Sequence, residues 1–309
     1  MNFLARVISI CLLGFHGALL LSAAEAPLDK TSAKVATLGA GAGRFEFQGA
    51  NQTVPVWYYL PENARPEAPV LIVMHGVHRD ASRYRDEWAP YAQTYGFILV
   101  APEFSEAAFP GSESYALGGT VDEKGHPLPR AQWAFSFIEP IFDAVKAATG
   151  SRSERYFLYG HSAGAQFVHR FLYFVPEARV GKAVAANAGW WTVPDPEIAF
   201  PYGLRGSAID DAALKTMLQR PLIVLLGTAD TDPAAENLRR TPGALAQGPN
   251  RFVRGHTFFA AGKHRAETLG VPFGWKLATA PGIAHSDSGM AAFAVPQLFD
   301  APASAGLKR

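Results

Sequence analysis

Hydrophobic residues in this chain alternate between short runs rich in β-branched or aromatic side chains and longer segments with a helical period. This alternation is typical of a parallel sheet whose strands are joined by crossover helices. The runs at 71–74 and 222–226 have no polar face, as expected of strands buried between two helix layers. The pattern predicts eight strands, at 44–48, 54–60, 70–74, 97–101, 156–159, 182–186, 222–226 and 275–279.

Four longer segments have helical character and lie in crossover positions between these strands. They are residues 82–95, 134–148, 163–174 and 288–298, the second delayed or kinked by Pro140. Two further stretches, 102–130 and 190–219, are rich in Gly, Pro and acidic or aromatic residues and do not fit the alternation. Because loops at the carboxyl ends of parallel strands build binding sites, we expect these two stretches to be substrate-binding insertions.

The N-terminus has the three parts of a signal peptide. Arg6 precedes an apolar run at 7–21, which ends in the small residues 22–24. We therefore expect residues 1–24 to be removed, which would leave an exported protein, periplasmic or secreted, with no stable membrane anchor. Residues 25–43 are rich in Ala, Thr, Lys and Gly and predict a flexible mature N-terminus. A single α/β domain is expected over residues 44–309.

Composition narrows the function classes. The chain has 309 residues, of which 49% are hydrophobic, so it can bury a large core. With 28 basic and 27 acidic residues, it has no net field that would attract nucleic acid. The one cysteine, Cys11, lies inside the apolar run, so the mature protein would hold no disulfide.

The strongest chemical motif reads GHSAG at residues 160–164 and has the form G-x-S-x-G. A strand is predicted directly before it and a helix directly after it, which is the context of a nucleophile elbow. In such an elbow Ser162 stands on a strained turn, and Gly160 and Gly164 remove side chains that would collide with the neighbouring strand and helix. The alternative is a serine N-cap in an ordinary strand-to-helix turn.

A serine hydroxyl needs a base to remove its proton and an acid to orient that base. His285 follows the last predicted strand and precedes the last predicted helix, so it is the candidate base. Asp230 follows the strand at 222–226 and is the candidate acid. Asp232 stays open as an alternative acid, whereas Asp287 is expected to cap the last helix.

Two backbone N–H groups are expected to form an oxyanion hole. One belongs to Ala163, immediately after the serine, and the other to Val77, in the loop after the strand at 70–74. His75 in the same loop is expected to be structural.

Aromatic residues in or beside the two insertions are candidates for the substrate pocket. Trp190 and Trp191 follow the strand at 182–186, and Tyr115 lies in the first insertion, where Phe109 and Trp133 could extend an aromatic wall. No cluster of basic residues along the sequence suggests a charged acyl group. No H-E-x-x-H or similar motif indicates a metal site, so neither a metal nor a cofactor is expected.

From residue 44 to residue 298 the chain resembles the α/β-hydrolases, and most closely their polyhydroxyalkanoate-depolymerase-like and carboxylesterase branches. The matching elements are His75-Gly76, the GHSAG run, the turn at 227–230 and His285. The resemblance implies a serine nucleophile and no metal or cofactor. Secreted polyester depolymerases of this family often carry disulfides and extra binding modules, and this chain has neither, which favours small esters over polymers.

The expected activity is hydrolysis of neutral, moderately hydrophobic carboxylic esters, small or polymeric, through an acyl-enzyme. Polyester depolymerisation, peptidase or amidase activity, and a non-catalytic binding function are the alternatives. The complete set of Ser162, Asp230 and His285 argues against the last of these.

Overall fold

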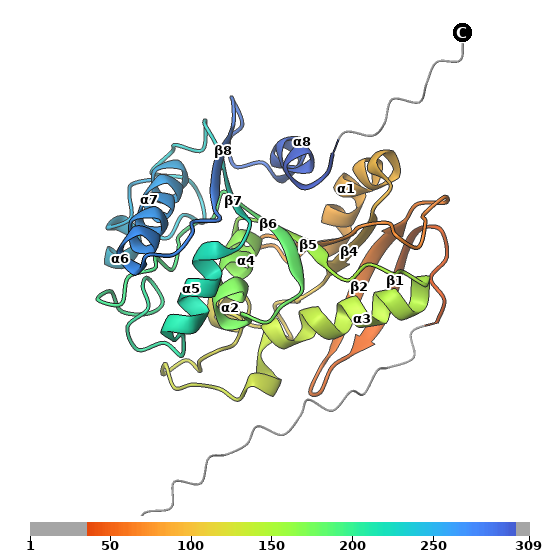
Figure 1. Ribbon diagram of the computed structural model, residues 1–309, viewed down its shortest axis with the longest axis horizontal. Coiled ribbons are helices and arrows are strands. Elements are labelled where there is room, and N and C mark those ends of the chain that lie inside the picture. The colour runs from red at the N-terminus through yellow and green to blue at the C-terminus, as the bar shows by residue number, and fades with distance from the viewer. Residues whose placement is uncertain (1–35, 301–309) are drawn as a thin grey trace, which may run out of the picture. The chain divides into compact units, whose positions relative to one another are not determined.

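The computed structural model describes residues 36–300 of the chain (Figure 1). The predicted signal peptide, at 1–24, and most of the predicted flexible segment, at 25–43, lie outside the described residues. Among the helices from residue 36 to residue 300, none has the length and apolar character that crossing a membrane requires.

An eight-stranded sheet forms the centre of the molecule, with the strand order β1-β2-β4-β3-β5-β6-β7-β8. The pairings β1 with β2 and β2 with β4 are antiparallel, and the other pairings are parallel. All eight predicted strands are present, with ends that differ by at most three residues. They are β1 (Gly41–Gln48), β2 (Thr53–Leu60), β3 (Val70–Met74), β4 (Ile98–Pro102), β5 (Tyr156–His161), β6 (Val180–Ala186), β7 (Leu222–Gly227) and β8 (Lys276–Ala280).

Helices cover both faces of this sheet and bury two separate apolar layers (Figure 1). Along β3, Leu71 and Val73 face the layer formed with α1 (Ala81–Tyr95) and α8 (Asp287–Leu298). Ile72 and Met74 face the layer formed with the other helices, which explains why β3 has no polar face. These helices are α3 (Ile138–Thr149), α4 (Ala163–Phe174), α5 (Asp211–Gln219) and α7 (Arg251–Leu269).

The four predicted helices are present as α1, α3, α4 and α8. The second begins as a 3-10 turn, η2 (Ala134–Phe137), and becomes α-helical at Ile138, so Pro140 lies in its first turn, where proline is tolerated. The predicted insertion at 190–219 is only partly irregular, because it contains α5, capped by the Asp210 side chain. Three further short helices are α2 (Gly111–Ser114), η1 (Arg130–Gln132) and α6 (Pro242–Leu245).

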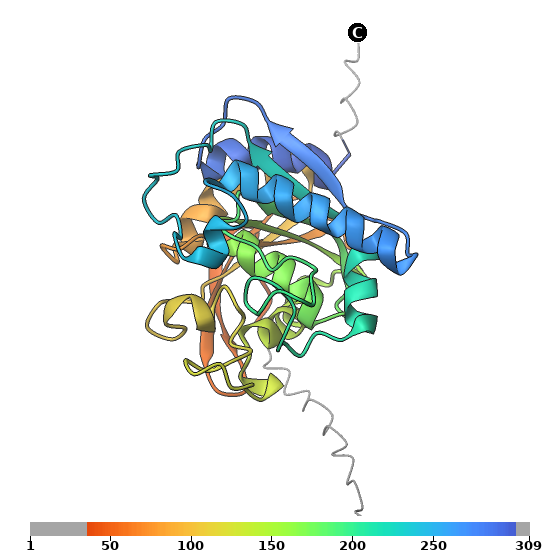
Figure 2. The ribbon, with the colours of Figure 1, turned by 90° about the vertical axis from the view of Figure 1, so that its left-hand side faces the viewer.

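The longest helix among residues 36–300, α7, was not predicted, and it packs on β7, near the β8 edge of the sheet (Figure 2). Two of its inward positions are glycines rather than large apolar residues. A Cβ on Gly255 would lie 2.2 Å from the Leu226 side chain, and one on Gly262 would lie 2.3 Å from Trp275. The helix therefore makes close contacts at glycine positions, which do not form the apolar stripe by which a helix is predicted from sequence.

Replacing Phe258 of α7 by alanine should lower the free energy of unfolding by about 3–5 kcal/mol. This ring is fully buried and stacks between Trp191 and Trp275, with centroid distances of 4.3 and 4.6 Å. Urea unfolding measures the loss, and Val253→Ala on the exposed side of α7 is the matched control, expected within about 0.5 kcal/mol of wild type. Similar losses for the two variants would contradict the buried position of Phe258.

Candidate active site

Ser162 occupies the turn between β5 and α4 in a strained backbone conformation, with φ 57° and ψ −114°. The turn is possible because the chain approaches itself closely on both sides. A Cβ on Gly160 would lie 2.3 Å from the Gly164 carbonyl, and one on Gly164 would lie 2.0 Å from the Met74 carbonyl oxygen. The geometry is that of a nucleophile elbow and excludes an ordinary N-cap, since the Ser162 side chain caps no helical N–H.

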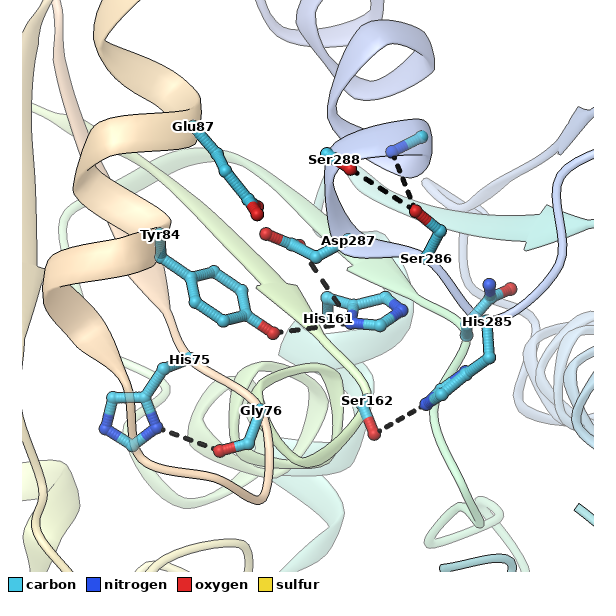
Figure 3. A network of polar contacts seen from close by, with 12 residues as sticks. His75, Gly76, Tyr84, Glu87, His161, Ser162, His285, Ser286, Asp287 and Ser288 are labelled. Carbon is cyan, nitrogen blue, oxygen red and sulfur yellow. Dashed lines mark hydrogen bonds and ion pairs between the residues drawn. The ribbon is translucent and has the colours of Figure 1, made fainter. Parts of the chain in front are cut away.

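The hydroxyl of Ser162 points at His285, which lies on the loop between β8 and α8 (Figure 3). The distance from His285 Nε2 to Ser162 Oγ is 3.0 Å, and that from His285 Nδ1 to Asp230 Oδ2 is 2.7 Å. Asp232 is exposed, and its carboxylate accepts a hydrogen bond from the Ala234 N–H. The structure therefore brings Ser162, His285 and Asp230 into one chain of hydrogen bonds and leaves Asp232 outside it.

Arg251, the first residue of α7, lies behind Asp230. Its Nη1 is 3.5 Å from Asp230 Oδ1, the carboxylate oxygen that does not face His285, and both side chains are buried. Burial lowers the pKa of Arg251, and the charge of Asp230 acts in the opposite direction. The prediction from sequence missed this ion pair, because the helix that carries Arg251 was not predicted.

A second carboxyl group, that of Asp287, lies buried near another histidine, His161 (Figure 3). The expectation that Asp287 caps the last helix was wrong, because Ser286 accepts the hydrogen bond from Gly289 and Asp287 turns into the core. Its Oδ1 accepts a hydrogen bond from the Tyr159 hydroxyl at 3.0 Å and lies 3.9 Å from His161 Nδ1.

His161 connects this buried group to the candidate base. Its ring centroid lies 4.6 Å from that of His285, and its Nδ1 is 3.4 Å from the Tyr84 hydroxyl. Burial lowers the pKa of His161 well below its usual range, and the neighbouring His285 acts in the same direction. Burial raises the pKa of Asp287 well above its usual range, and a hydrogen bond that the protonated Asp287 carboxyl donates to the neighbouring Glu87 carboxylate acts in the same direction. Burial thus favours the uncharged form of both His161 and Asp287.

The two expected oxyanion donors border the same pocket as Ser162. Within residues 36–300, the N–H groups of Val77 and Ala163 donate to no other backbone group, so both are free to bind a ligand. His75 holds the loop that carries Val77, because its Nδ1 bonds to the Gly76 carbonyl and its Nε2 accepts from the Phe104 N–H. Burial lowers its pKa to about 4, which agrees with a neutral, structural ring.

The pocket beside Ser162 has a volume of about 330 Å³. Tyr115 and Trp190 line it, as expected, and Gln166 of α4 lies beside them. Charged residues that the prediction missed also line it, namely Arg79, Glu106 and Arg239. They come from three different loops, so their proximity has no signal in the linear sequence.

Trp191 is not a pocket residue, which corrects the expectation from sequence. It is fully buried and stacks on Phe258 and against His169, on the inner side of α4 and α7. Adjacent residues in an extended loop point in opposite directions, so Trp190 faces the pocket while Trp191 fills the core. Phe109 is also a core residue, and Trp133 packs edge-on against Phe174.

No group of three potential metal ligands among His, Cys, Asp and Glu gathers in the part of the chain that the structure describes.

Replacing Asp287 by asparagine should raise the melting temperature by about 2–4 °C at pH 8 and by less at pH 5. A carboxyl group whose pKa is raised on folding binds more protons when folded, so its contribution to stability falls as the pH rises above its unfolded value near 4. Asparagine keeps an acceptor for Tyr159, supplies an N–H toward Glu87 and does not ionise.

Thermal unfolding of wild type and Asp287→Asn across this pH range measures the difference. Asp287→Ala, which loses the hydrogen bond to Tyr159, is the control and should be destabilised at every pH. A melting difference for Asp287→Asn that does not change with pH would show that Asp287 is ionised in the folded protein.

No protein-family model matches the chain. Among curated proteins it is 27% identical, over 143 residues, to a bifunctional acetylxylan esterase/xylanase from Neocallimastix patriciarum. That match covers 46% of this chain and spans only 18% of the fungal protein's length.

Among solved structures, the chain is similar to poly(aspartic acid) hydrolase-1 from Sphingomonas sp. KT-1, with 49% identity and a TM-score of 0.83 over 84% of this chain and 99% of that one. It is also similar to a poly(3-hydroxybutyrate) depolymerase from Bordetella parapertussis, with 36% identity and a TM-score of 0.81 over 86% and 93% of the two chains. An S-formylglutathione hydrolase from Agrobacterium tumefaciens, 16% identical with a TM-score of 0.55 over 85% and 96%, shares the fold. The chain therefore belongs to the α/β-hydrolase family and is a hydrolase of the esterase and depolymerase type.

Proposed function

We propose that the chain hydrolyses carboxylic esters through an acyl-enzyme formed on Ser162. The observation that carries the proposal is the continuous path from Asp230 through His285 to Ser162, with contacts of 2.7 and 3.0 Å. Contacts of this length allow a histidine to accept the serine proton while a carboxylate holds the imidazole in the required orientation.

In the first half of the reaction, Ser162 Oγ attacks the carbonyl carbon of the substrate and His285 Nε2 accepts the hydroxyl proton. The carbonyl oxygen becomes an oxyanion, for which the free N–H groups of Val77 and Ala163 are the proposed donors. When the tetrahedral intermediate collapses, the bond from carbon to the alcohol oxygen breaks and His285 gives its proton to the leaving alcohol.

In the second half, His285 removes a proton from water, and the resulting hydroxide adds to the acyl carbon. The bond to Ser162 Oγ then breaks, the serine regains a proton from His285, and the carboxylic acid leaves. During both halves Asp230 Oδ2 stabilises the imidazolium. The contact of Arg251 with Oδ1 keeps the carboxylate in the orientation that faces His285.

Amide cleavage is a second candidate, favoured by the 49% identity to a protein named poly(aspartic acid) hydrolase-1. Aspartyl residues in such a polymer are joined by amide bonds, so the same acyl-enzyme would form with an amine as leaving group. The similarity to a poly(3-hydroxybutyrate) depolymerase keeps polymeric esters among the proposed substrates.

Ser162→Ala and His285→Ala should each lower kcat for a p-nitrophenyl ester by about three orders of magnitude or more. Asp230→Asn should lower it somewhat less, because the histidine would keep its position but adopt the wrong tautomer. Steady-state kinetics with p-nitrophenyl acetate and butyrate measure these losses.

Asp232→Asn is the matched control for the acid and should stay within about twofold of wild type, because Asp232 lies outside the hydrogen-bonded path. Melting temperatures of all four variants must remain near that of wild type for the comparison to hold. Full activity in Ser162→Ala, or a loss confined to Asp232→Asn, would refute the proposed site.

We also propose that the chain is exported, on the basis of the pattern at residues 1–24. Expression in a Gram-negative host should place the protein in the periplasm with Glu25 as its first residue. Mass spectrometry of the intact periplasmic protein tests this, and a cytoplasmic protein that retains residues 1–24 would contradict it.

A further inference from the structure

Three guanidinium groups meet around the pocket beside Ser162, although they lie far apart in the sequence. Arg79 follows β3, Arg239 lies on the loop between β7 and α6, and Arg170 belongs to α4. The first two line the pocket, and Arg170 lies directly behind its Trp190 wall. Within residues 36–300, Glu106 is the one carboxylate that lines this pocket.

Both Nη atoms of Arg79 already have partners, whereas its buried Nε has none among residues 36–300. Arg79 forms an ion pair with Glu106 at 3.0 Å and donates to the carbonyl oxygens of Phe104 and Gly111. Its guanidinium carbon also lies 4.3 Å from the centroid of Tyr115. Arg79 therefore builds the pocket wall, and Glu106 balances its charge.

Arg239 has no such partner. Within residues 36–300, no carboxylate lies within 4.0 Å of its guanidinium, whose protein hydrogen bond is a 3.4 Å contact with Ser112 Oγ. Glu113 accepts from the same hydroxyl but forms no ion pair with Arg239. The guanidinium carbon lies 4.7 Å from the centroid of Trp190, which holds the half-buried side chain against the pocket wall.

Arg170 adds a buried cation that forms no ion pair with any carboxylate of residues 36–300. It is fully buried, donates to Thr192 Oγ1 and the Ala116 carbonyl, and lies 4.0 Å over the Trp190 ring, while its Nη2 has no protein partner. Burial and the nearby charge of Arg239 lower its pKa, as expected of a cation that lacks a compensating anion. An unpaired buried charge is costly, so an anion in the pocket would stabilise this arrangement.

We propose that this pocket binds a free carboxylate of the substrate, with Arg239 as the specificity-determining residue and Trp190 as the surface against which it is held. The inference rests on the proposed function and names its substrate class as esters or amides that carry a carboxylate close to the scissile bond. A guanidinium binds a carboxylate through two parallel N–H donors. Apart from the contact with Ser112 Oγ, the N–H groups of Arg239 make no hydrogen bond to residues 36–300, so they can bind such a carboxylate. Ser162 lines the same pocket, so a carboxylate bound there belongs to the molecule that is cleaved.

The test compares two esters that differ only in this group, monoethyl adipate and the ethyl ester of adipic acid monoamide. Wild type should prefer the anionic ester by about tenfold or more in kcat/KM at low salt, the size expected for a hydrogen-bonded charge pair. Arg239→Gln should reduce that ratio to about threefold or less, and Arg239→Lys should keep part of it. Arg240→Gln, at the exposed neighbouring arginine, is the matched control and should keep the wild-type ratio.

Binding to the Ser162→Ala protein separates this inference from the proposed function. Isothermal titration calorimetry should show that monoethyl adipate binds more tightly than the amide, and that adding Arg239→Gln weakens its binding by about tenfold. If the protein binds with this selectivity but wild type turns over neither ester, the result would support the carboxylate pocket and refute the hydrolase mechanism. Two results would overturn the carboxylate pocket and leave the hydrolase mechanism intact. One is turnover of both esters by wild type with equal kcat/KM, and the other is an affinity for monoethyl adipate that Arg239→Gln does not change.

Discussion

The close contact between the Gly160–Gly164 turn and the end of β3 is the constraint on which the site depends. Because Gly164 lies against the Met74 carbonyl and Gly160 against Gly164, the chain leaves β5 and enters α4 without room for a side chain at either position. Ser162 is thereby held at φ 57°, and its hydroxyl points away from the sheet toward His285. Ala163, the first residue of α4, and Val77, on the loop after β3, line the same pocket as this hydroxyl.

Two buried carboxyl groups near this turn, those of Asp230 and Asp287, have different surroundings. The carboxylate of Asp230 is paired with Arg251 on one oxygen and bonded to His285 through the other. Asp287 is as deeply buried and contacts His161, and burial together with the neighbouring Glu87 carboxyl raises its pKa and so favours its neutral form. His285 is therefore hydrogen-bonded to one carboxylate, that of Asp230, while the Asp287 carboxyl is separated from it by the His161 ring.

The sequence was enough to predict the sheet and the residues at the ends of its strands. Buried parallel strands have a strong local pattern, and Ser162, Asp230 and His285 each follow such a strand directly, so their convergence follows from the topology. The helix α7 was missed because glycines occupy its closest contacts, and Arg251 was missed with it. Trp191 was misplaced because the sequence does not show which of two adjacent tryptophans turns inward. The charge of the pocket could not be anticipated, since Arg79, Arg170 and Arg239 come together only in the folded chain.

Covalent labelling of Ser162 tests the central claim most directly, because it reports the reactivity of one hydroxyl without requiring the natural substrate. A fluorophosphonate probe should modify the folded protein once, and peptide mass spectrometry should place the adduct on Ser162. Labelling should be lost after denaturation and slowed by orders of magnitude in His285→Ala, because the hydroxyl is reactive only when the folded histidine removes its proton. A folded protein that stays unlabelled, or that is labelled at another residue, would contradict the account.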